Sequence, residues 1–208
     1  MILIEGQIGA GKTTLGEILE QRLGLPLFRE LHNPVTTTLL DRYYLDKHRW
    51  AYTMQTHFLA ERFRMTRELV RSGGGIMDRS IFGDSIFARM LAAEGYMDSE
   101  EFSTYTALLE EMLEYIPPPR LLIYLDCSVD TAMERIRSRD RGNESGIPRT
   151  YLDALNRHYL AWYEQYDLSP RIFVNTEEFH IDNPDEVEPV IHRISRSLTS
   201  GGIRHTVR

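Results

Sequence analysis

The residues with the clearest chemical potential form one glycine-rich segment near the amino terminus. The segment fits the pattern G-x-x-x-x-G-K-[ST] and consists of Gly6, Gln7, Ile8, Gly9, Ala10, Gly11, Lys12, Thr13 and Thr14. Glycines let successive backbone N–H groups turn inward around phosphate oxygens, and the N-terminus of a following helix adds a partial positive charge. Lys12 can reach the β- and γ-phosphates, and the Thr13 hydroxyl can ligate Mg²⁺. The segment therefore predicts that the chain binds a nucleoside triphosphate.

The flanks of this segment predict the elements that must position it. The apolar run before the segment predicts a strand. After the segment, the apolar residues of Leu15–Leu23 are spaced as in a helix. Short apolar runs alternate with longer helical patterns along the whole chain, which predicts an α/β fold with a parallel sheet covered on both faces. The predicted strands are Ile2–Glu5, Leu25–Arg29, Gly75–Asp78, Leu121–Asp126 and Arg171–Asn175. The predicted helices cover residues 13–24, 48–72, 80–95, 98–115, 128–139, 148–166 and 185–198. We expect one domain over residues 1–198 and a mobile tail over residues 199–208.

Charged residues follow several of the predicted strands. Glu30 follows the second strand, Asp78-Arg79-Ser80 the third, and Asp126 ends the fourth. In an open parallel sheet, ligands bind at the carboxyl ends of the strands, so these groups should converge on the triphosphate. A phosphotransferase needs this layout, because its protein mainly positions groups and neutralises charge.

Composition narrows the class of protein. The net charge of −7 over 208 residues argues against a general nucleic-acid binder, which needs a basic surface. The single cysteine, Cys127, excludes an internal disulfide and fits a reducing compartment. No apolar run approaches the length of a membrane span, and the first strand begins at Met1, where a targeting peptide would lie. We therefore expect a soluble cytoplasmic protein with no nucleic-acid or membrane partner.

Five segments resemble one known family in their order and spacing. This family is the deoxynucleoside kinases, which includes deoxycytidine, deoxyguanosine and bacterial deoxyadenosine kinases. They are the glycine-rich segment, Glu30, and residues 44–62, 78–84 and 135–151. The resemblance covers nearly the whole chain. It implies a P-loop kinase fold with a five-stranded parallel sheet and an Arg-rich lid. It also implies ATP- and Mg²⁺-dependent phosphorylation of a deoxynucleoside 5′-hydroxyl in nucleotide salvage, and a homodimer formed through two packed helices.

The resemblance gives acidic and basic residues catalytic roles. Asp78-Arg79-Ser80 looks like the family's acidic-Arg-Ser motif, in which the carboxylate binds Mg²⁺ or acts as the base. Arg79 would bridge the transferred phosphoryl group and the attacking hydroxyl. Glu30 resembles the carboxylate that accepts the 5′-hydroxyl proton. In the family a proline usually follows it directly, whereas here Pro34 comes four residues later. The choice of base between Glu30 and Asp78 stays open at this point.

A second set of residues resembles the family's nucleoside pocket. Gln55 and Arg62 are seven residues apart, two helical turns, and so share one helix face. A buried Arg62 and Asp84 would each need a partner. The resemblance implies that Gln55 pairs with the base edge, that Arg62 and Asp84 form a coupled pair at its far end, and that Tyr44 contacts the sugar 3′-hydroxyl.

The lid and the donor loop are the last matching parts. Arg135 resembles the arginine that stacks on the donor base, while Arg139 and Arg141 resemble those that grip the phosphates. Glu144 matches the lid carboxylate that reaches the sugar 3′-hydroxyl. Asp140 is a departure, because a small residue is usual there. The donor adenine would contact a loop after the fifth strand that consists of Glu177, Glu178 and Phe179.

Two alternatives compete with this interpretation. A nucleoside monophosphate kinase of the thymidylate type would need additional arginines beside Glu30, where only Arg29 is present. A non-catalytic structural relative would usually lack Lys12, Asp78 or Arg79, and all three are present. The pocket residues are compatible with adenine, guanine and cytosine. The segment from residue 78 to 88 resembles bacterial members and favours a purine, deoxyadenosine especially.

Overall fold

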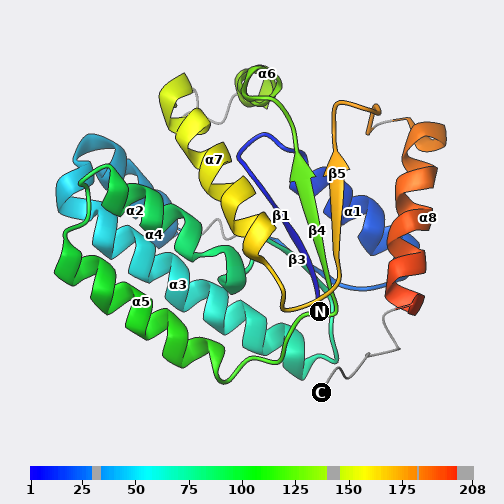
Figure 1. Ribbon diagram of the computed structural model, residues 1–208, viewed down its shortest axis with the longest axis horizontal. Coiled ribbons are helices and arrows are strands. Elements are labelled where there is room, and N and C mark those ends of the chain that lie inside the picture. The colour runs from blue at the N-terminus through cyan, green and yellow to red at the C-terminus, as the bar shows by residue number, and fades with distance from the viewer. Residues whose placement is uncertain (30–33, 140–145, 182, 201–208) are drawn as a thin grey trace.

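A parallel five-stranded sheet with the order β2-β3-β1-β4-β5 forms the centre of the fold (Figure 1). The computed structural model describes residues 1–29, 34–139, 146–181 and 183–200. The register pairs Ile4 of β1 with Asp78 of β3 on one side and with Ile123 of β4 on the other. The carboxyl end of β1 therefore lies between the carboxyl ends of β3 and β4. The strands are β1 Ile2–Gly6, β2 Leu27–Phe28, β3 Ile76–Asp78, β4 Leu121–Asp126 and β5 Arg171–Asn175.

Helices cover both faces of the sheet. They are α1 Lys12–Leu23, α2 Pro34–Leu45, α3 Lys47–Arg71, α4 Ser85–Ala93, α5 Ser99–Leu113, α6 Val129–Arg139, α7 Arg149–Gln165 and α8 Pro184–Ser200, with a 3₁₀ turn, η1, at Ile81–Gly83. In Figure 1, α2, α3, α4, α5 and α7 lie on one side of the strands, and α1 and α8 lie on the other. Within the described ranges, no helix is both long and apolar enough to cross a membrane.

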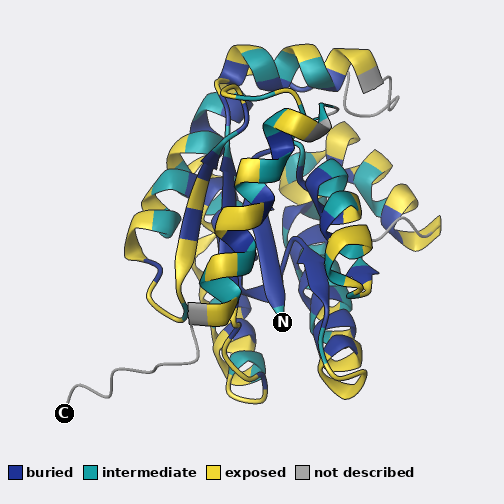
Figure 2. Cartoon of the chain, turned by 90° about the vertical axis from the view of Figure 1, so that its right-hand side faces the viewer, coloured by how far each residue is buried: buried dark blue, intermediate teal, exposed yellow. Residues whose placement is uncertain are grey.

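The alternation of side chains along β1 divides the core in two. Ile2 and Ile4 belong to the cluster that includes residues of α1 and α8, and Leu3 belongs to the cluster that includes residues of α3, α4, α5 and α7. Figure 2 shows that the central strands are buried between these layers, while the edge strand β5 alternates between exposed and buried residues. Because period-two alternation puts Glu5 on the same face as Leu3, this carboxylate points toward the α3–α4–α7 side.

The five-stranded parallel sheet is confirmed, and the differences from the sequence predictions are local. Helix α2 was not predicted, because its early residues Val35-Thr36-Thr37-Thr38 are β-branched and have low helix propensity. Proline at its first position is compatible with a helix start. The second strand, predicted over Leu25–Arg29, is only Leu27–Phe28, because Pro26 offers no N–H to the ladder.

Two helix predictions also need correction. The helix predicted over residues 80–95 is divided into η1 and α4, since Ser80 is extended and the chain turns before α4 begins. The tail was expected to begin at residue 199, but α8 continues to Ser200. The remaining tail residues, 201–208, lie outside the described residues.

Candidate active site

The glycine-rich segment forms the turn between β1 and α1 (Figure 1), and its glycines are required by backbone geometry. Gly9 and Gly11 have φ angles of 86° and 89°, in the left-handed region that favours glycine. A Cβ on Gly9 would lie 2.7 Å from the carbonyl oxygen of Ala132 in α6. The loop is also tied to β4, because the Gln7 side chain donates to the Cys127 carbonyl at 2.7 Å. The turn thus depends on both local sequence and tertiary contact.

Lys12 occupies the interior of this turn. Its ammonium donates to the carbonyl oxygens of Gly6 at 3.0 Å and Gln7 at 2.8 Å. The side chain is buried although it is a lysine, and it begins α1. An ammonium held inside the loop is positioned to meet phosphate oxygens that enter it.

Thr13 and Asp78 bring two oxygen ligands together beside the loop. The Thr13 hydroxyl donates to Asp78 Oδ2 at 2.6 Å. The other carboxylate oxygen, Asp78 Oδ1, is buried and has no hydrogen-bond partner among the described residues. Hard oxygen donors of this kind suit Mg²⁺. Elsewhere in the described ranges, no group of three or more acidic, histidine or cysteine residues could hold a metal ion. A magnesium ion here would therefore take most of its ligands from nucleotide and water.

Arg79 has an unusual backbone and a well-defined side chain. Its φ of 63° is the one positive value at a non-glycine position within the described residues. Its N–H donates to the Ile4 carbonyl at 3.1 Å. Its guanidinium donates to the Tyr159 hydroxyl at 2.5 Å and lies 5.0 Å from the centre of the Phe87 ring. Positive φ at such a residue indicates strain that surrounding contacts must offset. Helices α4 and α7 therefore orient a cation beside Asp78.

A buried ion pair joins α3 to the turn before α4. Arg62 of α3 donates to Asp84 Oδ1 just before α4, and the two residues are 6% and 2% exposed. The Arg62 guanidinium also lies 4.7 Å from the centre of the Phe58 ring. Gln55, on the same helix, is 5% exposed. Asp84 Oδ2 and Gln55 Oε1 are buried and receive no hydrogen bond from any described residue. Two buried acceptors without donors indicate a ligand that supplies them.

The structure places Tyr44 on α2, where the sequence had indicated no helix. Tyr44 is 39% exposed, whereas its neighbour Tyr43 is buried. Their ring centres are 5.3 Å apart. Tyr43 belongs to the core cluster, so helix α2 is anchored by Tyr43 and leaves Tyr44 accessible to a ligand.

The residues predicted for the donor side cluster at the ends of β5 and α6. Arg135 donates to the Thr176 hydroxyl at 2.8 Å, to the Thr176 carbonyl at 2.9 Å and to the Gly9 carbonyl at 3.4 Å. Glu177 accepts hydrogen bonds from the hydroxyls of Ser128 and Thr131, and these bonds lower the pKa of the Glu177 carboxyl. Arg135 thus connects the phosphate loop to the loop after β5.

The other members of the donor loop are held by different contacts. Glu178 accepts a bond of 3.3 Å from the Asn175 side chain. Phe179 packs against the cluster that contains α1 and α8 residues. Three predicted site residues, Glu30, Arg141 and Glu144, lie outside the described residues. A fourth, Arg139, ends α6 with its side chain outside the description. Asp140, the departure from the family pattern, also lies outside the described residues.

Sequence reasoning missed one buried acid in this region. Glu5 is 1% exposed and accepts hydrogen bonds of 2.7 Å from both the N–H and the hydroxyl of Ser80. Burial raises the pKa of the Glu5 carboxyl, while the Ser80 donors and the charges of Arg79 and Arg62 oppose that shift. The available signal was a charged residue inside an otherwise apolar strand. Tyr159 and Phe87, which hold Arg79, gave no comparable signal because aromatic residues on helices usually indicate core.

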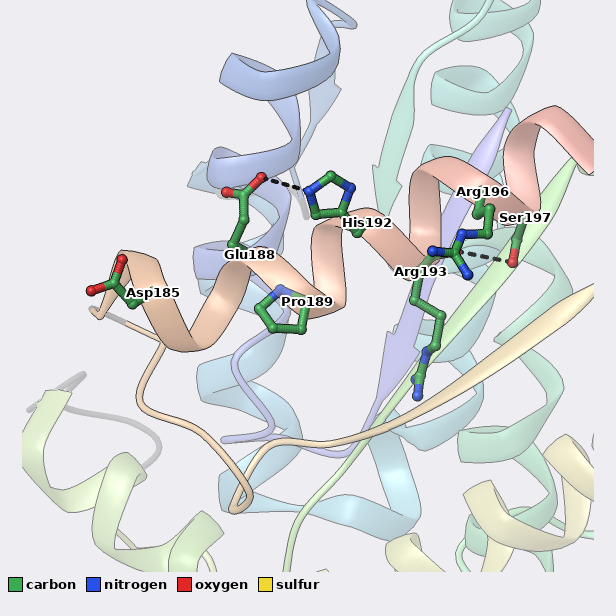
Figure 3. A pocket seen from close by; sticks show the side chains of 7 residues that line it. All are labelled: Asp185, Glu188, Pro189, His192, Arg193, Arg196 and Ser197. Carbon is green, nitrogen blue, oxygen red and sulfur yellow. Dashed lines mark hydrogen bonds and ion pairs between the residues drawn. The ribbon is translucent and has the colours of Figure 1, made fainter.

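A wide groove elsewhere on the surface is separate from this site. Figure 3 shows that its lining side chains come from α8 and include Glu188, His192 and Arg193. Glu188 pairs with His192 at 3.5 Å and with Arg22. Among the predicted site residues that the structure describes, none lines the groove.

The fold and these contacts define a class of protein. The site combines a phosphate loop after the central strand, an Asp-Arg pair at the neighbouring strand and the buried polar side chains Gln55, Arg62 and Asp84. These are the parts of an α/β phosphotransferase that uses a nucleoside triphosphate. Within that class, the chain belongs to the deoxynucleoside kinase family, whose model matches residues 2–199.

Similarity to individual proteins supports the same family assignment. The chain is 34% identical to a deoxyadenosine/deoxycytidine kinase of Bacillus subtilis, covering 94% of this chain and 91% of that one. It is 35% identical to a deoxyadenosine kinase of Lactobacillus acidophilus, covering 97% and 98%. The structure of deoxyadenosine kinase from M. mycoides with bound dCTP has a TM-score of 0.80 and 28% identity, covering 94% of this chain and 100% of that chain. This chain is a deoxynucleoside kinase, and neither the monophosphate kinase nor the non-catalytic alternative is retained.

Proposed function

We propose that this kinase transfers the γ-phosphoryl group of ATP to the 5′-hydroxyl of deoxyadenosine in nucleotide salvage. The observation that carries the base preference is the pair of buried acceptors, Asp84 Oδ2 and Gln55 Oε1, which no described residue satisfies. The amino group of adenine supplies the donors that such acceptors need. Cytosine also has an amino group, and it is the second candidate base. Thymine has a carbonyl at the corresponding edge and would leave the acceptors unpaired.

The donor side of the mechanism follows from the phosphate loop. The loop amides and Lys12 bind the β- and γ-phosphates of ATP, and Arg139 and Arg141 of the lid neutralise charge on the transferred group. Arg135 stacks on the donor base, which also contacts the loop formed by Glu177, Glu178 and Phe179. Thr13 and Asp78 would hold Mg²⁺, which would supply neutralisation of phosphate charge. The unpartnered Asp78 Oδ1 supports this assignment.

The acceptor side brings the nucleoside to the γ-phosphorus. Tyr44 and Glu144 bind the sugar 3′-hydroxyl, and Gln55 with the Arg62–Asp84 pair holds the base. The 5′-oxygen attacks the γ-phosphorus, the bond to the β-phosphate oxygen breaks, and ADP leaves. Glu30 accepts the 5′-hydroxyl proton. Arg79 stabilises negative charge on the group in transfer. The contacts of Arg79 with Tyr159 and Phe87 support a preorganised cation.

We further propose that two copies of the chain pair through α3 and α5. Support comes from exposed apolar side chains on or just beyond these helices, namely Val70, Leu108 and Tyr115. Sedimentation of the wild-type protein should give a dimer, and Leu108→Asp should give a monomer.

A cytoplasmic location is part of the same proposal, and the single, buried and unpaired Cys127 is compatible with it.

A substrate panel tests the proposal. The wild-type enzyme is assayed with ATP and Mg²⁺ against deoxyadenosine, deoxycytidine, deoxyguanosine and thymidine, and kcat/KM is measured for each. We expect deoxyadenosine to lead and thymidine to be at least about a hundredfold poorer. Efficient use of thymidine would contradict the assignment of the buried acceptors. A lead by deoxyguanosine would contradict the base preference and leave the kinase activity intact.

A further inference from the structure

The buried acid Glu5 has no role in the mechanism described so far. It is the second-to-last residue of β1, directly before Gly6, and its side chain lies on the face of the sheet that α3, α4 and α7 cover. A carboxylate is rarely buried to this degree without a specific partner. Glu5 accepts two hydrogen bonds from one residue, Ser80, whose N–H and hydroxyl each donate at 2.7 Å. Ser80 directly follows Arg79, the proposed transition-state cation.

These bonds act at the place where the chain leaves the sheet. Strand β3 ends at Asp78, and Arg79 then adopts a φ of 63°. The Arg79 N–H is still accepted by a main-chain oxygen of β1, that of Ile4, at 3.1 Å. The next N–H, that of Ser80, is instead accepted by the Glu5 side chain. Glu5 therefore replaces the next ladder acceptor, so the Ile4 carbonyl and the Glu5 carboxylate each hold one of the two peptide groups that flank the strained residue.

Packing above Glu5 extends the same restraint to the following turn. A Cβ on Gly83 in η1 would lie 2.8 Å from the carboxylate carbon of Glu5, so η1 rests directly on this group. The charges of Arg79 and Arg62 favour the ionised carboxylate. Two buried cations, Arg62 and Arg79, thus share this region with the buried anions Glu5 and Asp84.

We propose that Glu5 is a positioning residue for phosphoryl transfer, which holds the Arg79–Ser80 turn so that the Arg79 guanidinium meets the transferred phosphoryl group. The inference rests on the role proposed for Arg79. Glu5 touches neither substrate in this scheme and acts only through the turn. Its effect should therefore fall on the rate of the chemical step and not on nucleoside binding.

The central experiment is a double-mutant cycle between Glu5→Gln and Arg79→Lys, with steady-state kinetics for deoxyadenosine. Glutamine keeps an oxygen that can accept from Ser80 but removes the charge. We expect Glu5→Gln to lower kcat about tenfold to a hundredfold, because bonds to a charged acceptor are lost, and to change KM less than about threefold. In the Arg79→Lys background the same change should have almost no effect on kcat. A merely structural role would lower kcat equally in both backgrounds.

Two further variants complete the design. Ser80→Ala removes one donor to Glu5 and should lower kcat about threefold to tenfold, again only when Arg79 is present. Glu188→Gln on α8 is the matched control, since it neutralises an exposed carboxylate outside the site (Figure 3), and it should leave kcat unchanged. A Glu5→Gln kcat within twofold of wild type, or a loss that persists in full in the Arg79→Lys background, would overturn the inference. If Glu5→Gln does not fold, a Ser80→Ala loss that is equal in both backgrounds overturns it.

The role of Arg79 is tested separately within the same cycle. If Arg79→Lys alone retains wild-type kcat, the proposed mechanism fails and the inference falls with it. If Arg79→Lys is impaired while Glu5→Gln is not, only the inference about Glu5 fails.

Discussion

The phosphate side and the nucleoside side of the site are built in different ways. The phosphate side consists of backbone groups, glycines and Lys12 within one contiguous turn. The nucleoside side consists of side chains, Gln55 and Arg62 from α3 and Asp84 from the turn before α4, which meet only because the helices pack. A backbone site recognises what every nucleoside triphosphate shares. A side-chain site recognises one base edge. Substitutions on the phosphate side should therefore lower kcat, and substitutions on the nucleoside side should change the selectivity among nucleosides.

The largest effect is expected on the phosphate side. Lys12→Ala should reduce kcat by at least about a thousandfold, because the charge that meets the β- and γ-phosphates is lost. The fold should remain, since the ammonium donates to carbonyls of its own loop. Steady-state kinetics and thermal unfolding measure the two properties. Near wild-type kcat in a folded variant would contradict the role of Lys12.

The acid that accepts the proton gives the next largest effect. Glu30→Gln should lower kcat by about a hundredfold to ten-thousandfold, the range typical of losing a general base. Asp78→Asn should instead raise the Mg²⁺ concentration needed for half-maximal activity, because Thr13 and Asp78 are the proposed metal ligands. Activity is measured against pH and against Mg²⁺ for both variants. Full activity of Glu30→Gln across the pH range would move the proton acceptor to Asp78.

Substitutions on the nucleoside side should change which deoxynucleoside the enzyme prefers. Arg62→Met combined with Asp84→Ala removes both members of the buried pair and should raise thymidine kcat/KM relative to deoxyadenosine by about tenfold or more. Asp84→Ala alone should be the worse enzyme, because breaking a buried pair leaves the Arg62 charge uncompensated, at a cost of about 3–5 kcal/mol. Kinetics with four deoxynucleosides on wild type, both single variants and the double variant check this. Unchanged selectivity in the double variant would place the base elsewhere.

The smallest effect concerns stability and pH. Burial raises the pKa of Glu5, against the opposing influence of Ser80, Arg79 and Arg62. Glu5 in turn raises the pKa of Tyr166 at the end of α7, where burial is the larger cause. A carboxyl with a raised folded-state pKa keeps its proton longer in the folded state than in the unfolded chain. The wild-type free energy of unfolding therefore loses a contribution as pH rises from the unfolded pKa, about 4.3, through the folded pKa.

Glutamine at position 5 does not titrate. The Tm of Glu5→Gln minus the Tm of wild type should therefore increase as pH rises. Each kcal/mol corresponds to about 2–4 °C for a chain of this size. Thermal unfolding between pH 5 and pH 8 measures the difference. A constant gap between the two melting temperatures would show that the Glu5 pKa is not raised. A variant that gains stability while losing activity would mark Glu5 as a group kept for function.

The sequence alone determined the parts of this protein whose physics is local. The glycine loop, Lys12 and Thr13 lie in one segment, and the strand and helix that flank it follow from hydrophobic periodicity. The parallel sheet follows from alternating apolar runs and helices. The resemblance to the deoxynucleoside kinases, now confirmed at the level of the family, also came from residues in order along the chain.

Only the tertiary structure decided features that depend on packing between distant segments. Helix α2 forms despite its β-branched start, because Tyr43 and Thr36 are buried against the rest of the fold. The pairing of Arg62 with Asp84 requires α3 to pack against the turn before α4. The contact of Glu5 with Ser80 joins residues that are 75 positions apart, and no local pattern marks it. Burial, which makes Glu5 a hydrogen-bond partner of Ser80, is a property of the folded chain and not of its sequence neighbours.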